Sequence, residues 1–261
     1  MRDATVEIYE GQNLVEQLTF QGPDPLPDGA DTRKGFFRSA SFRPASGIAY
    51  TVKVSAPGFE AVEGTDVAPS STTFIEEFTY LGMIEEDEFS SYPQFRLNLK
   101  DNDPGENFYH VSAIATSYYW TLEGGDTTVI DSWEIRPSIK LGNSSGNDLI
   151  DNETDGFLTI LSDGLIFENS SFIDENKELL IGFVGIQPSS DGNDGRYYDV
   201  RVEIRSISEA YFLYQRSLKL QDMTQSDPFA EPVFVFNNIE KGLGNFAGYS
   251  SLLSDVLRIN E

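Results

Sequence analysis

The residue types that most often carry catalysis are scarce in this chain of 261 residues, which has one histidine and no cysteine. A catalytic triad needs a histidine to shuttle protons, and most zinc sites use more than one nitrogen or sulfur ligand. His110 lies in the middle of an extended run, so we interpret it as a sheet residue that lacks the partner geometry of catalysis. The absence of cysteine also excludes disulfides, thiol catalysis and thiolate metal sites.

Carboxylates are abundant, with 43 Asp and Glu against 18 Lys and Arg, so a paired acid and base is available on numbers alone. Most carboxylates, however, solvate the surface of a protein. No stretch combines two of them with a clustered aromatic platform, as a glycosidase cleft would. We therefore predict that the protein is not an enzyme and has no catalytic residues.

Three acidic loops, at 101–106, 148–156 and 191–195, have the composition of calcium ligand sets. Calcium takes roughly six to eight oxygen ligands, and Asp and Asn that alternate before a Gly can wrap the ion. None of the loops completes the EF-hand pattern, and the same residue types form ordinary β-turns. Calcium is the one cofactor that we consider, and its candidate ligands are Asp101, Asp103, Asp148, Asp151 and Asp155.

Aromatic side chains form the other candidate site. Neighbouring residues of a strand point to opposite faces, so the run 118–120 turns at least one ring away from the core. Exposed rings suit a binding surface, although a sandwich core also uses aromatic residues. The binding residues that we predict are Tyr118, Tyr119, Trp120 and Trp133.

The charge balance narrows the classes of partner. The formal net charge of −25 repels phosphate backbones and anionic head groups, so we predict that nucleic acid is not a partner. The same charge is compatible with cations, with a basic protein surface and with plain solubility. The longest apolar runs, such as 179–184, are much shorter than the roughly 20 residues of a membrane helix.

The elements that must position these residues are mostly strands. Aromatic residues make up 13% of the chain, and short alternating runs recur between turn residues, as in antiparallel sheets. The runs at 5–9 and 14–20 predict a hairpin. One helix is predicted near 208–221, where Ser208 can cap apolar residues at helical spacing. A last strand is predicted to begin at 233–236.

These patterns predict an all-β fold in two domains. A turn-rich stretch at 67–71 follows a set of short strands, so we expect a small N-terminal Ig-like sandwich over 1–71. Residues 72–261 are expected to form a larger antiparallel β-sandwich domain that carries the helix. The glycines of the segment 242–250 do not fit a phosphate-binding pattern, and we interpret that segment as structural.

Several segments resemble a known family. The run 103–109, Asp-Pro-Gly-Glu-Asn-Phe-Tyr, is similar to that family's Asp-Pro-x-Gly-x-Asn-Tyr-Tyr segment, and 207–214 resembles its helix. The stretch 50–59 fits its N-terminal Ig-like module. Residues 227–232, 237–239 and 242–250 are similar to the closing signature of the family. The family is the Bacteroidetes lipoprotein group called domain of unknown function 4249.

The resemblance implies a place at the cell envelope. Members are typically outer-membrane lipoproteins encoded beside TonB-dependent receptors, and the family offers no established catalytic residues to carry over. We expect a non-enzymatic accessory or ligand-binding protein that works with a TonB-dependent receptor at the outer membrane, on its cell-surface or periplasmic face. The leader and the lipidated Cys are expected outside this sequence, so membrane association would require a lipid anchor that this chain does not carry.

Two other functions remain open from the sequence. A carboxylate-based hydrolase of glycan or peptide would have a close carboxylate pair in a deep cleft. A structural module of an outer-membrane assembly would instead present a flat complementary face without a pocket. Where the structure places the carboxylates and the aromatic rings therefore helps to decide among the accessory protein, the hydrolase and the structural module.

Overall fold

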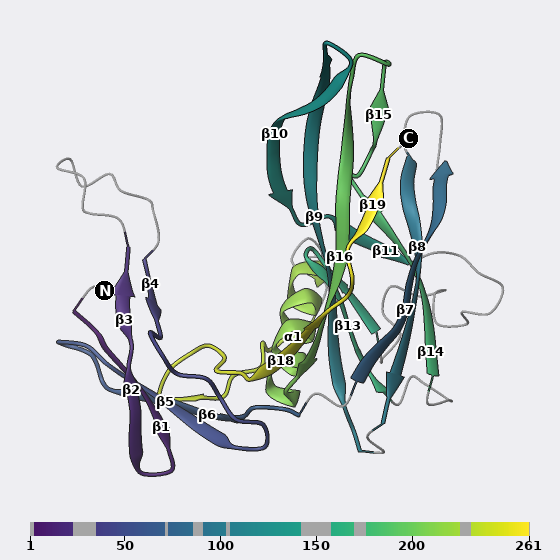
Figure 1. The fold of residues 1–261 in the computed structure, drawn as a ribbon. Helices are drawn as coiled ribbons and strands as arrows, with labels where there is room; N and C mark the ends of the chain where they lie inside the picture. Colours follow the sequence, from purple (N-terminus) through teal and green to yellow (C-terminus); the bar gives the residue numbers. More distant parts are fainter. Residues whose placement is uncertain are drawn as a thin grey trace. The chain divides into compact units, whose positions relative to one another are not determined.

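The computed structural model describes residues 3–22, 35–70, 73–85, 91–102, 105–141, 158–169, 176–224 and 231–260. Within these ranges the chain is all-β apart from one helix, which confirms the predicted fold class (Figure 1). The chain divides into two compact units, of which the first comprises 1–70 and 207–250 and the second 71–206 and 251–261. The predicted division between 71 and 72 falls beside the first boundary, whereas 207–250 joins the N-terminal unit and not the C-terminal one.

The first unit is built on a five-stranded antiparallel sheet with the order β17-β6-β5-β1-β2. The predicted hairpin is present, because β1 and β2 pair around a turn in which Gly11 has a φ of 58°. The Ig-like character of this unit stays a prediction. The strands of the sheet are β1 (Thr5–Glu10), β2 (Asn13–Gln17), β5 (Ala49–Ser55), β6 (Val62–Val67) and β17 (Ile239–Glu240), and a separate ribbon pairs β3 (Thr19–Gln21) with β4 (Phe36–Arg38).

The glycine-rich segment closes onto this sheet, as its structural interpretation predicts. Phe246 packs against the small core that contains the buried Tyr50. Gly248 permits the close approach, since a Cβ atom at this position would lie 2.9 Å from the carbonyl oxygen of Val67. The amide of Gly248 also donates to Asp66 Oδ2 at 2.6 Å. These contacts explain why the C-terminal segment belongs with the N-terminal sheet.

The helix α1 (Glu209–Thr224) begins where the sequence predicts and ends slightly later. The amide of Tyr211 donates to Ser208 Oγ at 3.3 Å, so Ser208 is the N-cap. The prediction of a strand at 233–236 is wrong, since this described stretch has no strand. The amide of Phe236 instead donates to Ser217 Oγ on α1 at 2.8 Å, which satisfies a donor that a sheet would otherwise use.

The second unit consists of an eight-stranded and a four-stranded antiparallel sheet, which confirms the predicted sandwich-like character. The larger sheet follows the path β12-β13-β9-β16-β15, with β10 attached to β9 and with β18 and β19 attached to β16, and the smaller has the order β11-β14-β8-β7. The bounds are β7 (Thr73–Glu85), β8 (Ser91–Asp101), β9 (Phe108–Glu123), β10 (Asp126–Ile135), β11 (Ser138–Leu141), β12 (Leu158–Leu161), β13 (Gly164–Glu168), β14 (Asn176–Val184), β15 (Ser189–Ser190), β16 (Asp194–Ile207), β18 (Tyr249–Leu253) and β19 (Leu257–Ile259).

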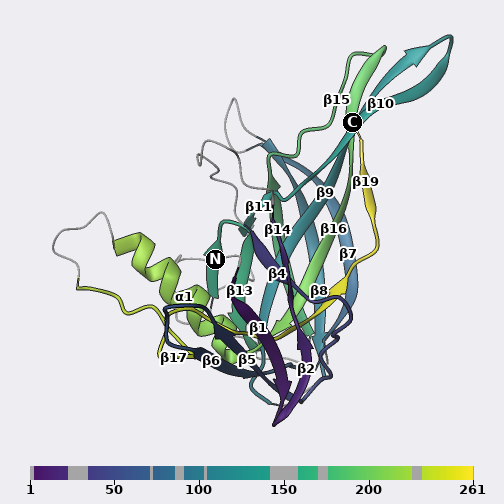
Figure 2. The ribbon, with the colours of Figure 1, turned by 90° about the vertical axis from the view of Figure 1, so that its left-hand side faces the viewer.

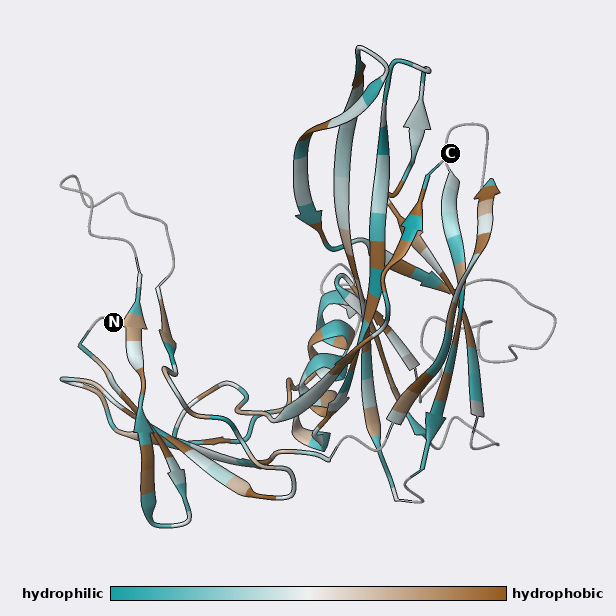
Figure 3. Ribbon diagram, viewed as in Figure 1, coloured by the Kyte–Doolittle hydropathy of each residue, from teal (hydrophilic) through white to brown (hydrophobic). Residues whose placement is uncertain are grey.

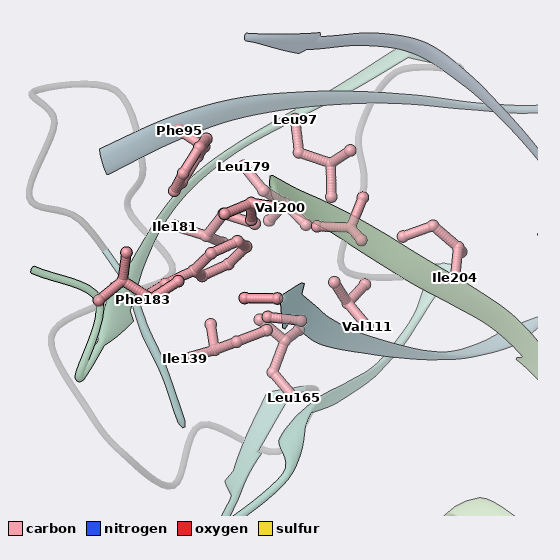
Figure 4. Packing of buried hydrophobic residues seen from close by; sticks show 14 of the residues in the cluster. Phe95, Leu97, Val111, Ile139, Leu165, Leu179, Ile181, Phe183, Val200 and Ile204 are labelled. Carbon is pink, nitrogen blue, oxygen red and sulfur yellow. The ribbon is translucent and has the colours of Figure 1, made fainter. Parts of the chain in front are cut away.

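One apolar core lies between these two sheets. Along β16 buried and partly buried residues alternate from Tyr198 to Val202, so this strand turns every second side chain towards the core, whereas β9 is buried without a break from Tyr109 to Ala115 (Figure 3). Phe95, Val111, Ile181 and Val200 converge there from four different strands (Figure 4). The rings of Phe95 and Phe183 lie only 4.5 Å apart between centroids. This close packing fixes the strands of the second unit, and it therefore also fixes the side chains that these strands present beyond the core.

Candidate functional site

Two long strands of the larger sheet continue past the packed core. β9 has 16 residues and β16 has 14, and their far ends, with β10 and β15, run beyond β7 and β8 (Figures 1 and 2). Along β9 the residues are buried up to Ala115 and become exposed from Leu122 onward. We call this extension the projecting ribbon and define it as residues 117–135 and 189–197.

One face of the projecting ribbon carries a stack of two tyrosines and an arginine. Tyr118 and Tyr197 are stacked, with 4.8 Å between ring centroids and 15° between ring planes. The guanidinium of Arg258 lies 4.5 Å from the centroid of Tyr197. Asp199 holds this guanidinium with two hydrogen bonds of 2.7 and 2.8 Å and thereby raises the pKa of Arg258 further above its usual range. The stack therefore presents a guanidinium that is held in place by its ion pair on an aromatic surface.

Trp120 shares that face with Tyr118, because the two are separated by one residue in β9. Its ring packs on the backbone of β16 at Gly195, where a Cβ atom would lie 2.8 Å from Trp120 Cζ2. The same Cβ atom would also collide with the carbonyl oxygen of Ser189. Trp120 is thus half-buried, and it fixes the packing of the ribbon as well as contributing to its surface.

Trp133 lies on the opposite face of the ribbon. It pairs with Ser117 across β9 and β10, so it points to the same side as Tyr119. The guanidinium of Arg196 lies 5.1 Å from the ring centroid of Trp133, whose side chain stays 40% exposed. The structure therefore brings the four predicted binding residues to one ribbon but divides them between two faces, with Tyr118 and Trp120 on one and Tyr119 and Trp133 on the other.

The ribbon also exposes aliphatic side chains that the sequence analysis missed. Leu122, Val129 and Ile130 are 38%, 46% and 57% exposed, respectively. The turn between them consists of Gly124 and Gly125, which both have positive φ angles. Two adjacent glycines between alternating runs are a hairpin signal that would have revealed this tip.

The projecting ribbon is acidic. Its one basic residue is Arg196, and its six carboxylates belong to Glu123, Asp126, Asp131, Glu134, Asp191 and Asp194. Asp191 serves the turn itself, because its Oδ1 accepts from the amides of Asn193 and Asp194 at 2.9 Å each. These hydrogen bonds, with the one from Asp194 first, lower the pKa of Asp191 below its ordinary value. The 191–195 loop is thus a β-turn in which this carboxylate is already engaged.

Asp101 is the one candidate calcium ligand among the described residues, because Asp103, Asp148, Asp151 and Asp155 lie outside them. Its Oδ2 atom accepts hydrogen bonds from Tyr109 Oη at 2.5 Å, from Asn107 Nδ2 at 3.2 Å and from Asn169 Nδ2 at 3.4 Å. In the described ranges no group of three or more His, Asp or Glu is arranged to hold a metal ion. Asp101 therefore anchors the segment before β9, and calcium binding stays a prediction.

His110 is a buried residue of β9, as the sequence analysis expects of a sheet residue. Its Nε2 atom lies 3.9 Å from Asp163 Oδ1. Burial lowers the pKa of His110, so the neutral imidazole is favoured. The neighbouring Gly164 has no room for a side chain, since a Cβ atom there would lie 2.7 Å from His110 Nε2. His110 thus fills a tightly packed position of the sheet.

Glu203 is the most buried carboxylate of the described residues, and two arginines neutralise it. Arg205 Nη2 donates to Glu203 Oε2 at 2.7 Å, and Arg136 Nη1 lies 4.0 Å from the same oxygen. Burial alone would raise the pKa of Glu203, but the hydrogen bond and charge of Arg205, together with the charge of Arg136 and a hydrogen bond from Ser251, outweigh burial and lower it. A general acid requires the opposite shift. Glu203 is therefore an ion-paired residue of the sheet.

Comparisons with known proteins place the chain in a family. No curated protein and no solved structure matches it. In the described ranges no helix is both long and apolar enough to cross a membrane. The model of the family described as a domain of unknown function (DUF4249) matches residues 1–252, in agreement with the motifs at 103–109 and 242–250. The chain therefore belongs to the DUF4249 family.

Proposed function

We propose that this protein is a non-enzymatic accessory protein that binds a partner protein through the projecting ribbon. The observation that carries the proposal is the set of aromatic and arginine side chains on strands that extend beyond a rigid core. Tyr, Trp and Arg dominate the binding energy of protein interfaces. Arg196 of the ribbon and Arg258 of the adjacent β19 already stack on rings, which reduces the entropy that these side chains would lose on binding.

The partner that we propose is a TonB-dependent receptor of the outer membrane, since the family resemblance of the sequence implies an outer-membrane lipoprotein that works beside such a receptor. The acidic ribbon adds a physical argument. Carboxylates such as Asp126 and Glu134 would attract a basic face of the receptor and steer it into register. The overall charge of −25 would extend this attraction over the first approach of the two proteins.

A hydrolase has less support from the described residues. Glu203 is paired with arginine and has a lowered pKa, and Asp101 accepts from a tyrosine and two asparagines. Glu203 thus has the opposite pKa shift from the one that a general acid needs, and the hydrogen bonds of Asp101 give it a structural role. We therefore place the activity of this protein in binding, with no catalytic step.

A pull-down from the native host tests the proposal. The full parent protein, extracted in detergent, is expected to bring down a β-barrel receptor that mass spectrometry identifies. Trp133→Ala is expected to reduce recovery of the receptor, because it removes a ring that is 40% exposed. Phe74→Ala is the matched control, since Phe74 is 53% exposed on an edge strand of the other sheet and should bind as the wild type does.

Two results would count against the proposal. Recovery of the protein alone at every salt concentration would exclude a stable receptor complex. Equal loss of the receptor with Trp133→Ala and with Phe74→Ala would show that binding does not depend on the ribbon.

A further inference from the structure

The outermost strand of the projecting ribbon, β10, has an open edge. Its residues pair with β9 from Asp126 opposite Glu123 to Ile135 opposite Ala115. No strand of the described residues pairs with its other edge. Nine of its ten residues are exposed, so side chains on both of its faces are accessible. An open strand of this length presents a row of backbone donors and acceptors to any strand that can approach it.

The edge carries features that select what can approach. Val129 and Ile130 offer apolar contact, while Asp126, Asp131 and Glu134 surround them with negative charge. The pairing register shifts between Val129 and Asp131, which is the signature of a β-bulge. Asp131 Oδ1 accepts from the amide of Ser132 at 2.8 Å, so this carboxylate lies along the backbone of the edge strand. Charges and bulges are the devices by which edge strands avoid indiscriminate pairing.

The same charges distinguish between possible occupants. A second copy of β10 would bring three more carboxylates and no cation to this edge, so the two strands would repel each other. An extended segment with lysine or arginine would meet opposite charges on both faces, because Asp131 and Glu134 point to opposite sides of β10. Apolar residues between its cations would pack on Val129 and Ile130. The edge thus fits a basic, partly apolar strand and disfavours a copy of itself.

We propose that β10 receives an extended basic segment of its partner as an added strand of the eight-stranded sheet. The inference rests on the proposed function, since it specifies how the ribbon recognises its partner. Backbone hydrogen bonds along β10 supply affinity, and the charges of Asp126, Asp131 and Glu134 supply selectivity. Trp133 flanks the strand on one face and shields the added backbone from water on that side.

A peptide of defined chemistry tests the inference on the full chain. The probe is a fluorescent ten-residue peptide of repeating Lys-Lys-Val-Val, and binding is followed by anisotropy. One control peptide has Glu in place of Lys, and another carries N-methyl groups on alternate amides that remove the donors of one edge. Hydrogen exchange read by mass spectrometry then locates the protected amides of the protein.

The inference predicts that the Lys peptide binds, that the amides of 126–135 become protected, and that N-methylation weakens binding by about tenfold or more. The double variant Asp131→Lys and Glu134→Lys should weaken the Lys peptide by a similar factor and bind the Glu peptide better than the wild type does. The matched control is Glu76→Lys with Glu85→Lys. It reverses two exposed carboxylates on β7, the edge strand of the other sheet, and should leave both affinities unchanged.

Three outcomes would overturn the inference. These are the absence of Lys-peptide binding, binding that is indifferent to N-methylation, and protection that falls outside β10. The pull-down separates these failures from a failure of the proposed function. A receptor that is recovered through Trp133 without strand addition would refute this inference alone, whereas peptide binding without any receptor would refute the proposed function alone.

Discussion

Substitution of Gly195 by alanine tests the packing that holds the projecting ribbon together. The new methyl group would lie 2.8 Å from Trp120 Cζ2 and would also collide with the carbonyl oxygen of Ser189. The first neighbour is the large ring of Trp120 and the second is a backbone atom of Ser189, so neither can move aside without a substantial loss of packing. Overpacking of this kind typically costs about 1–3 kcal/mol. We therefore expect Gly195→Ala to lower the free energy of unfolding of the second unit by about that amount.

The measurement is urea unfolding of the full chain, followed by tryptophan fluorescence. A Trp133→Phe background leaves Trp120 as the reporter, because the chain has two tryptophans. The emission of Trp120 in the native state should shift towards that of an exposed indole as the ring is displaced. Gly192→Ala is the matched control in the same hairpin, since a Cβ atom there has nothing within 4 Å and the change strains only a φ of 90°. It should leave the native emission unchanged.

Unchanged stability and unchanged emission in Gly195→Ala would refute the packing of Trp120 on Gly195. An equal emission shift in Gly192→Ala would also refute it, because the effect would then come from the loop and not from the contact. Either result would leave Trp120 without the packing role that its contact with Gly195 implies.

Two further perturbations test the packing within each of the two units. Phe95→Ala should destabilise the second unit by about 3–5 kcal/mol in chemical denaturation, whereas the exposed Phe74→Ala should change it by less than about 0.5 kcal/mol, and equal effects would refute the core. Glu16 accepts hydrogen bonds from the Ser39 hydroxyl and from the amides of Ala40 and Phe42, and they lower its pKa to about 2. Its stabilisation is therefore complete above the unfolded pKa of about 4.5 and is lost as the pH falls towards about 2. Acid titration of the melting temperature should show this loss in the wild type and less of it in Glu16→Gln, and identical titrations would contradict the assignment.

Much of the fold follows from local signals in the sequence. The alternation in β1 and β8 and the cap at Ser208 identify these elements, because period-2 patterning and capping chemistry depend on neighbouring residues alone. The strand predicted at 233–236 failed for a reason that lies outside its own sequence. Ser217 on α1 takes the amide of Phe236, and no local pattern reports a hydrogen bond across 19 positions.

The candidate site was predicted in part. Aromatic residues at 118–120 and 133 identify the ribbon, since adjacent positions of a strand cannot both face the core. Their division between two faces depends on the register of β9 with β10, in which Trp133 meets Ser117. The role of Arg258 could not be predicted from the sequence. Arg258 lies 61 positions after Tyr197, and only the pairing of β19 with β16 brings it to that ring.

Photo-crosslinking in the native host tests most directly whether the ribbon is the binding surface. A photoreactive amino acid placed at Ile130, which is 57% exposed, should form an adduct with a β-barrel receptor of the outer membrane. The same group placed at Phe74, which is 53% exposed on the other sheet, should form none. A receptor adduct from Phe74 with none from Ile130, or no adduct from either position, would contradict the account.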